Sequence, residues 1–179
     1  PAIALSFRDQ FIPSSSYTYT YDTSYGREVD NRFVWQLMGM SAGNILSGIT
    51  SLLGQHGEKR IFGSSFSQFV KGSAEMVYYH RFRPDHWLVG RLFIGAEHAY
   101  GNSQEVPYSE QFYIGGANSI RAFTIRSLGP GSYLPPQDDV DGYFDQTGTF
   151  KLEANLEYRF PIWGDLHGAA FVDAGNIWL

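Results

Sequence analysis

The stretch from residue 150 to residue 160 alternates without exception between apolar and polar side chains. Its even-numbered positions carry Phe, Leu, Ala, Leu, Tyr and Phe, and its odd-numbered positions carry Lys, Glu, Asn, Glu and Arg. Successive side chains of a β-strand point to opposite faces of the sheet, whereas a helix repeats every 3.6 residues. The stretch therefore predicts a long strand with one apolar face and one charged face.

The same period of two recurs along the chain, so that we expect about seven strands in total. The other strands are predicted at residues 2–8, 15–21, 32–40, 66–82, 87–100 and 166–176. Tight turns are expected at Pro84 and just after Pro161, because proline pre-sets the backbone angle that a turn needs. Residues 43–53 break the alternation with apolar side chains at helical spacing, which indicates a short amphipathic helix or a folded loop.

Composition and charge exclude several classes of function. The net charge is -5 and the 13 Lys and Arg residues are scattered, so the chain offers no basic stripe to a nucleic acid. It contains no Cys and therefore no disulfide framework, thiolate metal site or thiol nucleophile. No stretch approaches the roughly 18 consecutive apolar residues of a membrane-spanning helix. If the chain crosses a membrane, it crosses as strands.

Two all-β architectures remain, a soluble antiparallel sandwich and a transmembrane barrel. Hydrophobic residues make up 43% and aromatic residues 17% of the chain, yet the mean hydropathy is -0.25. Long alternating strands, joined by alternately tight and long connections, favour an antiparallel transmembrane β-barrel with an apolar face toward lipid. Open sheet edges cannot be satisfied in hydrocarbon, so we expect these strands to be part of a larger barrel.

One stretch differs from the strands around it: QFYIGGANSIRAF, residues 111–123. Gly115 and Gly116 supply backbone freedom that other residues lack. The segment that follows them, Ile120, Arg121, Ala122 and Phe123, places one cation between two apolar anchors. Residues 127–147 then form a long stretch rich in Gly, Pro and Asp, which predicts a large external loop.

This stretch, together with FKLEANLEYRFPI and FVDAGNIW further along, resembles the C-terminal half of the BamA/TamA superfamily of outer-membrane assembly barrels, also called the bacterial surface antigen family. The resemblance covers residues 108–179. It implies that residues 1–179 are one partial outer-membrane barrel domain, from a barrel of about 16 strands. It also implies that the loop at about 108–147 folds back into the lumen.

In that family, the arginine of the loop contacts acidic residues that project inward from the next strands. Glu157 and Asp173 fall at the matching positions, and the alternation places both on the polar face. A guanidinium is a planar fork of donors that two carboxylates can satisfy together. Ala122 departs from the family, which usually has glycine there. If this position needs a positive φ, alanine costs roughly 1 kcal/mol.

The resemblance implies a non-enzymatic factor that assembles or inserts other outer-membrane proteins, or translocates them, in the outer membrane of a Gram-negative bacterium. The implied partners are the lipid bilayer, client outer-membrane proteins, periplasmic domains of the same full-length protein and accessory subunits. No cofactor is expected. A general insertase, a TamA-like factor and a two-partner secretion pore all remain open. A passive porin or adhesion barrel is the alternative from another class.

A serine esterase is a more remote alternative. Residues 39–43 fit G-x-S-x-G around Ser41, and Asp85 and His98 follow in the order that a nucleophile elbow requires. The chain lacks the alternation of strands and helices on which such a site is built, so we expect Ser41 to be a loop residue. Residues 138–142 are acidic like half of a calcium loop, but Gly148 stands where the bidentate Glu belongs. No metal-ligand spacing connects the five histidines, which are His56, His80, His86, His98 and His167.

Overall fold

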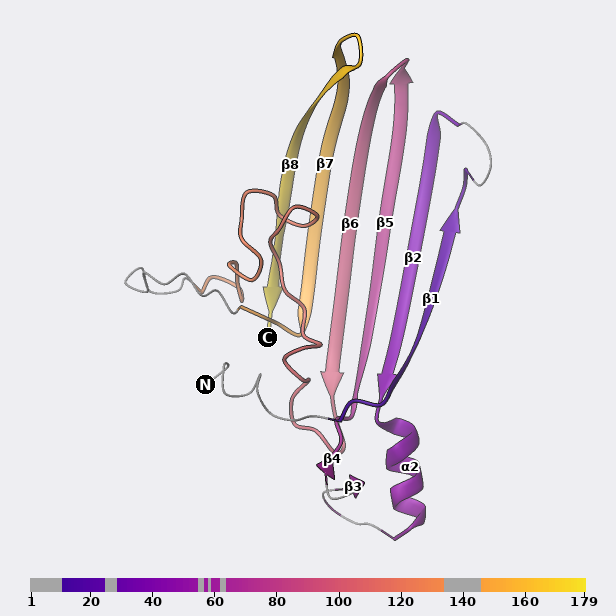
Figure 1. Cartoon of the computed structure of the whole chain (residues 1–179), viewed down its shortest axis with the longest axis vertical. Coiled ribbons are helices and arrows are strands. Elements are labelled where there is room, and N and C mark those ends of the chain that lie inside the picture. The colour runs from indigo at the N-terminus through magenta and orange to yellow at the C-terminus, as the bar shows by residue number, and fades with distance from the viewer. Residues whose placement is uncertain (1–10, 25–28, 55–56, 58, 62–63, 134–145) are drawn as a thin grey trace.

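A single curved sheet dominates the computed structural model (Figure 1), which describes residues 11–24, 29–54, 57, 59–61, 64–133 and 146–179. The sheet has six strands in the order β1-β2-β5-β6-β7-β8, and every neighbouring pair is antiparallel. The strands are β1 (Ser14–Asp22), β2 (Asn31–Ala42), β5 (Phe69–Arg83), β6 (His86–Ala99), β7 (Phe150–Trp163) and β8 (Leu166–Trp178). The chain is thus a meander, as expected for part of an all-β barrel.

The prediction of an antiparallel all-β fold is confirmed. Six of the seven predicted strands appear in the sheet, and the one at residues 2–8 lies outside the described residues. A second sheet was not predicted: β3 (Arg60–Ile61) and β4 (Ser64–Ser65) form a small hairpin. Within the described part of the chain, no helix is long and apolar enough to cross a membrane.

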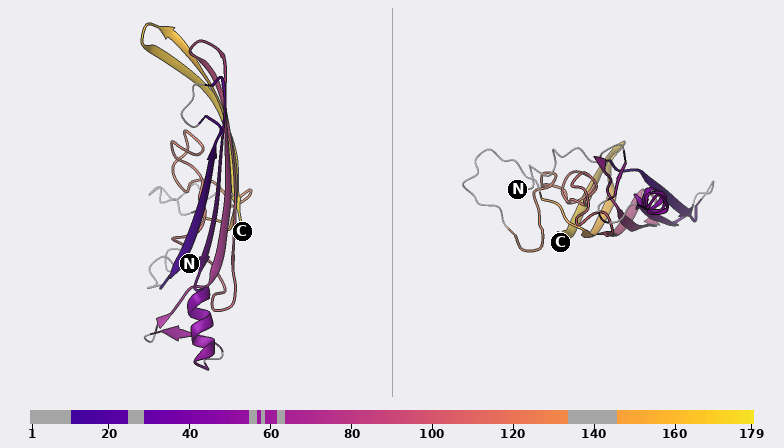
Figure 2. Two further views of the ribbon diagram at one scale, coloured as in Figure 1. Left: turned by 90° about the vertical axis from the view of Figure 1, so that its right-hand side faces the viewer. Right: turned by 90° about the horizontal axis from the view of Figure 1, so that it is seen from below.

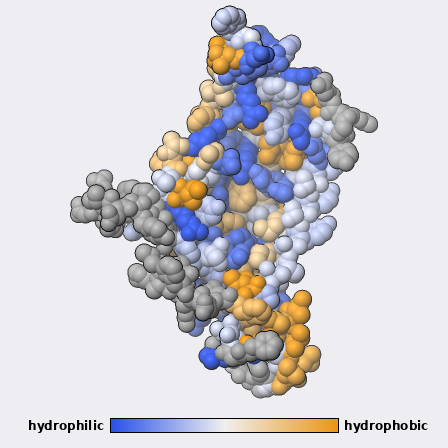
Figure 3. Space-filling view, viewed as in Figure 1, coloured by the Kyte–Doolittle hydropathy of each residue, from blue (hydrophilic) through white to orange (hydrophobic). Residues whose placement is uncertain are grey.

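The two faces of the sheet differ as the alternation requires. The outward face is apolar and open, with Leu37, Leu92 and Leu156 each 42–50% exposed. The inner face carries the charged residues, and the described part of the loop between β6 and β7 lies mainly against it (Figure 2). Viewed from the side on which the loop lies, the middle of the molecule is mainly hydrophilic (Figure 3). This is the reverse of a soluble protein, in which the apolar face of a sheet is covered.

Buried apolar side chains gather where the loop meets the inner face. Phe112, Ile114 and Ile120 of the loop pack with Ile177 of β8, and Ile114 and Ile177 are both 0% exposed. A smaller cluster joins Ala42, Phe69 and Val106 at the loop end of the sheet. The core of the described chain is therefore a contact between loop and sheet.

The predicted amphipathic helix is confirmed as α2 (Asn44–Leu52). It begins after Gly43, whose φ of 70° and whose contact with the Ser67 carbonyl leave no room for a side chain. Its polar side faces the protein, because the Lys59 ammonium donates to Ser47 and Ser51. Its apolar side is exposed, with Leu52 at 90%, and forms the hydrophobic patch at the bottom of Figure 3.

Candidate functional site: the arginine loop on the inner face

The loop between β6 and β7 is fixed at its base by a backbone bridge and by an aromatic ring. The N–H groups of Phe112 and Gly148 each donate to the other residue's carbonyl, at 3.0 and 2.9 Å. The Phe112 ring lies against the inner face at Gly95, where a Cβ would come within 2.5 Å of the ring. The Lys71 ammonium lies 4.5 Å from the ring centroid and pairs with Glu97 at 3.6 Å. We call these contacts the base contact.

Beyond the base, the loop turns sharply at the two glycines singled out in the sequence. Gly115 and Gly116 have φ values of 105° and 95°, and a Cβ on Gly115 would lie 2.2 Å from the Thr124 carbonyl oxygen. The Gly116 N–H donates to the Phe123 carbonyl at 2.9 Å and so closes the turn. The turn presents Ile120, which is 5% exposed, to the sheet. Phe123 is 50% exposed and is not the second apolar anchor that the sequence suggested.

Arg121 lies at the tip of this turn and points at the inner face of β7 and β8. Its Nε and Nη2 donate to the two carboxylate oxygens of Asp173, at 2.8 and 2.7 Å, and its backbone N–H donates to Asp173 at 3.0 Å. Its Nη1 donates to Glu157. The guanidinium also lies 3.6 Å from the centroid of the Phe171 ring. One cation is thus held by two carboxylates and an aromatic face, which we call the tip contact.

The two carboxylates have further partners that fix their positions. Asp173, whose side chain is only 4% exposed, accepts a hydrogen bond from the Asn155 amide at 2.9 Å. The same amide donates to the Ser119 carbonyl of the loop at 2.8 Å. Arg159 donates to Glu157 at 2.5 Å. The pKa of Arg121 is raised above its ordinary value, first by its hydrogen bonds to Asp173 and also by those to Glu157.

A buried carboxylate that sequence reasoning did not single out also holds the loop. Glu153 on β7 is 0% exposed and accepts a hydrogen bond from the Ser119 hydroxyl at 2.6 Å. Lys151 lies 2.9 Å from Glu153, and Arg91 bridges Glu153 to Glu75. The alternation placed all four charged residues on the polar face. Their grouping depends on the register, which sets Glu75 and Glu153 on either side of one residue of β6.

Ala122, where the related family usually has glycine, has a φ of 69°. This is the left-handed region, in which a Cβ approaches the following carbonyl oxygen. The tip of the loop therefore has the conformation that a glycine favours, and this chain adopts it with alanine.

The residues of the alternative sites do not come together. Ser41 lies in strand β2 and not in a loop, and its hydroxyl accepts a hydrogen bond from Asn44 at 2.5 Å. Asp85 precedes β6 whereas His98 lies near the other end of that strand, about 40 Å away. Residues 138–142 lie outside the described residues. Among the residues that are described, no group of three or more His, Cys, Asp or Glu could hold a metal ion.

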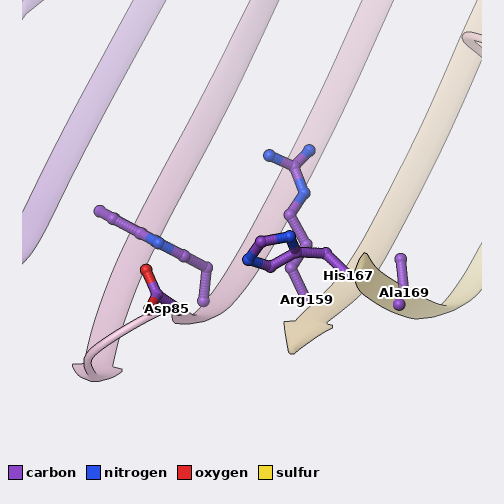
Figure 4. Close-up of a pocket in the computed structure, with 6 residues that line it drawn as sticks. Asp85, Arg159, His167 and Ala169 are labelled. Atoms are coloured by element: carbon purple, nitrogen blue, oxygen red, sulfur yellow. The ribbon is translucent and has the colours of Figure 1, made fainter. Parts of the chain in front are cut away.

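A pocket of about 290 Å³ lies at the far end of the sheet from the loop's base (Figure 4). Asp85 of the turn between β5 and β6 and Trp87 of β6 line it together with Arg159 and His167. It takes in neither Arg121 nor its two carboxylates, although Arg159 also touches Glu157. The arginine loop is therefore the candidate functional site.

Comparison with known proteins agrees with this geometry. A family model described as the Omp85 superfamily domain matches residues 16–179. The chain belongs to the Omp85 superfamily. It is similar to an outer membrane protein assembly factor BamA from Neisseria meningitidis serogroup B, with 24% identity over 165 residues, which are 89% of this chain and 19% of that protein.

A second relative is the outer membrane protein assembly factor BamA from Nitratidesulfovibrio vulgaris. It is 37% identical over 105 residues, which are 58% of this chain and 12% of that protein. The chain therefore spans about a fifth or less of the length of these relatives. The resemblance to a BamA/TamA-type barrel is confirmed, and the match begins well before residue 108, where the sequence motifs begin.

Proposed function

We propose that this Omp85 domain is part of an outer-membrane barrel that assembles and inserts other outer-membrane proteins, and that the arginine loop shapes the interior of that barrel. The observation that carries the proposal is the tip contact, in which Arg121 joins the loop to Asp173 and Glu157 on two adjacent strands. Porins keep a water-filled channel, whereas here a loop is anchored on the inner face of the sheet. Both relatives are named as assembly factors.

The chemistry of the site is mechanical and electrostatic, since no bond is made or broken. Arg121, Glu157 and Asp173 hold the loop against β7 and β8, and the base contact holds the start of the loop against β5 and β6. The loop thereby braces four neighbouring strands from the inside, while their outward face stays apolar. We propose that this bracing keeps one wall of the barrel rigid while client strands are handled elsewhere on the barrel.

The proposed location and partners of the domain follow from this role. The outward face contacts the lipid of the outer membrane of a Gram-negative bacterium, because its exposed Leu and aromatic side chains match a hydrocarbon environment. Client outer-membrane proteins are the substrates. Periplasmic domains of the same full-length protein and accessory subunits are the further partners. The reaction needs no cofactor and is not enzymatic.

The test is made in a strain whose only copy of the full-length protein is the variant. Arg121→Ala is expected to lower the steady-state amounts of several unrelated outer-membrane barrels while the variant itself still reaches the membrane. Arg81→Ala is the matched control, because Arg81 also lies on the inner face but pairs with Asp30, far from the loop. Normal barrel levels in Arg121→Ala, with loss of only one small-molecule uptake activity, would contradict assembly and favour a porin.

A further inference from the structure

The end of the sheet that carries the short turns has a continuous belt of aromatic rings on its outward face. We call it the ring belt, and its members are Tyr78, His80, Phe82, His86, Tyr158 and Phe160. Phe82 lies at its centre, with ring centroids 5.8 Å from both His86 and Tyr158 and 6.2 Å from His80. The belt therefore crosses β5, β6 and β7 without a break.

A β-bulge brings an arginine onto the same face. Arg81 pairs with Trp87 and Arg83 pairs with His86, so Phe82 is an extra residue between them. In such a bulge two residues of one strand oppose one residue of the partner, so Phe82 and Arg83 both lie opposite His86. Both are exposed. The bulge thus adds a cation to the edge of the ring belt.

The next hairpin, formed by β7 and β8, also contains a β-bulge, and the exposed residues beside it are apolar. The register shifts between Pro161 and Trp163, and Trp163 then pairs with Leu166. Ile162, Trp163 and Leu166 are 57%, 86% and 59% exposed. Two successive short turns therefore extend the outward apolar face beyond the regular strands, one with a cation and one with a tryptophan.

Hydrogen bonds hold the polar atoms of the belt. Tyr78 donates to the Asn31 side-chain oxygen at 2.8 Å, and His80 Nδ1 lies 2.7 Å from the same oxygen. The Tyr158 hydroxyl lies 2.8 Å from His86 Nδ1. When Tyr158 donates to Nδ1, the ring proton of His86 is on Nε2, where it is available to an external acceptor.

We propose that the ring belt and Arg83 form a docking surface for the headgroups of anionic phospholipids. The proposal rests on the membrane location proposed above. The belt continues the lipid-facing surface of Leu88, Leu92 and Leu156, and it ends at the short turns, which in outer-membrane barrels lie on the periplasmic side. Aromatic rings with polar tips favour the membrane interface, and a lipid phosphate accepts hydrogen bonds from arginine.

The positive charge of Arg83 favours an anionic headgroup over a zwitterionic one. Arg83 and His86 face each other across the strand pair, so one phosphate can accept from both. Every member of the ring belt is aromatic, and the acid of the same turn, Asp85, lines the pocket with Trp87 and Arg159 of the inner face. One arginine near a membrane surface corresponds to about a fivefold preference for an anionic lipid.

The test uses the purified full-length protein in detergent, titrated with phosphatidylglycerol or with phosphatidylcholine of the same acyl chains, and native mass spectrometry counts the bound lipids. Phosphatidylglycerol is expected to bind about fivefold more tightly than phosphatidylcholine to the wild type. Arg83→Gln is expected to remove that preference. His86→Phe, which keeps the ring, is expected to reduce it.

The controls are residues at the same height on the opposite face. Arg81→Gln and His167→Phe alter inner-face residues, and both variants are expected to keep the wild-type preference. Equal binding of the two lipids by the wild type would overturn the proposal, and so would an equal loss of preference in Arg81→Gln. This experiment measures lipid selectivity alone. A negative result would therefore reject the docking surface without rejecting the assembly function, which is tested separately by the amounts of outer-membrane barrels.

Discussion

The arginine loop is held at two places by different kinds of interaction. The tip contact is made of charged hydrogen bonds from Arg121 to Asp173 and Glu157. The base contact is mainly the Phe112 ring lying on Gly95 beneath Lys71. Charged hydrogen bonds are directional and fail when one partner is removed, whereas apolar packing is lost in proportion to area. The tip contact therefore fixes the position of the loop on the sheet, and the base contact keeps the start of the loop against the sheet.

Site-specific labelling separates the two contacts. This chain contains no Cys, so a single reactive thiol can be introduced near the tip by Ile120→Cys, or by Val106→Cys in the separate cluster with Ala42 and Phe69 where the loop begins. Ile120 and Val106 are 5% and 3% exposed. A maleimide can react only when the covering loop opens, so the labelling rate reports the free energy of local opening. The measurements require a full-length protein without other cysteines.

The largest effect is expected from Arg121→Ala. It leaves Asp173, whose side chain is 4% exposed, without its main cationic partner. Breaking a buried pair costs about 3–5 kcal/mol, and about 3 kcal/mol is expected here because the Arg121 side chain is 23% exposed. Labelling at Ile120→Cys should accelerate by at least a hundredfold, and labelling at Val106→Cys much less. Equal acceleration at both sites would mean that the tip and the base open as one unit.

Phe112→Ala is expected to have the second largest effect. Removing a buried Phe side chain costs about 3 kcal/mol. Labelling at Ile120→Cys should then accelerate, because Phe112 packs with Ile120 in one cluster, but by less than in Arg121→Ala, because the charged tip contact is untouched. Phe123→Ala serves as the control, since Phe123 is 50% exposed and should change neither rate by more than about twofold. A greater acceleration at Ile120→Cys in Phe112→Ala than in Arg121→Ala would show that apolar packing, and not the charged tip contact, fixes the position of the loop.

Ser119→Ala should have a smaller effect confined to the tip. It removes a 2.6 Å hydrogen bond to Glu153 and the acceptor of the Gly115 N–H at 3.1 Å, whereas Glu153 keeps Lys151 and Arg91 as partners. A hydrogen bond to a charged group contributes about 1.5–3 kcal/mol, and the lower value is expected here. Labelling at Ile120→Cys should rise about tenfold. Ser127→Ala is the control, because the Ser127 hydroxyl donates to the nearby Thr124 carbonyl within the loop.

Ala122→Gly is expected to have the smallest effect and the opposite sign. Ala122 has a φ of 69°, which costs a residue with a Cβ about 1 kcal/mol. Glycine relieves this strain, although it also gains freedom in the open state. Labelling at Ile120→Cys should slow by about threefold or less. Faster labelling would show that the conformational freedom of glycine stabilises the open loop more than the relief of strain stabilises the closed loop.

The sequence was sufficient for those features that depend on local pattern. Strict alternation over residues 150–160 defined a strand and its two faces, and that alternation alone placed Glu157 on the polar face. The contact of Arg121 with Glu157 and Asp173 also needed the family resemblance, because nothing local tells where a loop folds back. The apolar spacing after Gly43 was likewise sufficient to predict α2.

The remaining features depend on register and on tertiary contacts. Glu153 and Ser119 are 34 residues apart, and their hydrogen bond forms only because the loop crosses β7 at that height. The bulge that places Arg83 beside Phe82 opposite His86 leaves no trace in the alternation. The exposed apolar side of α2 contradicts the usual expectation that an amphipathic helix buries its apolar residues. Its polar side is bound by Lys59, which comes from outside the helix.

The side chains of Arg121 and Asp173 are expected to act together in holding the loop on the inner face. A double-mutant cycle tests this cooperation, with Arg121→Ala and Asp173→Asn made singly and together and the labelling rate at Ile120→Cys measured in each. We predict that the two changes are strongly non-additive, with a coupling free energy of about 2 kcal/mol. Additive effects, with a coupling near zero, would show that this pair does not hold the loop.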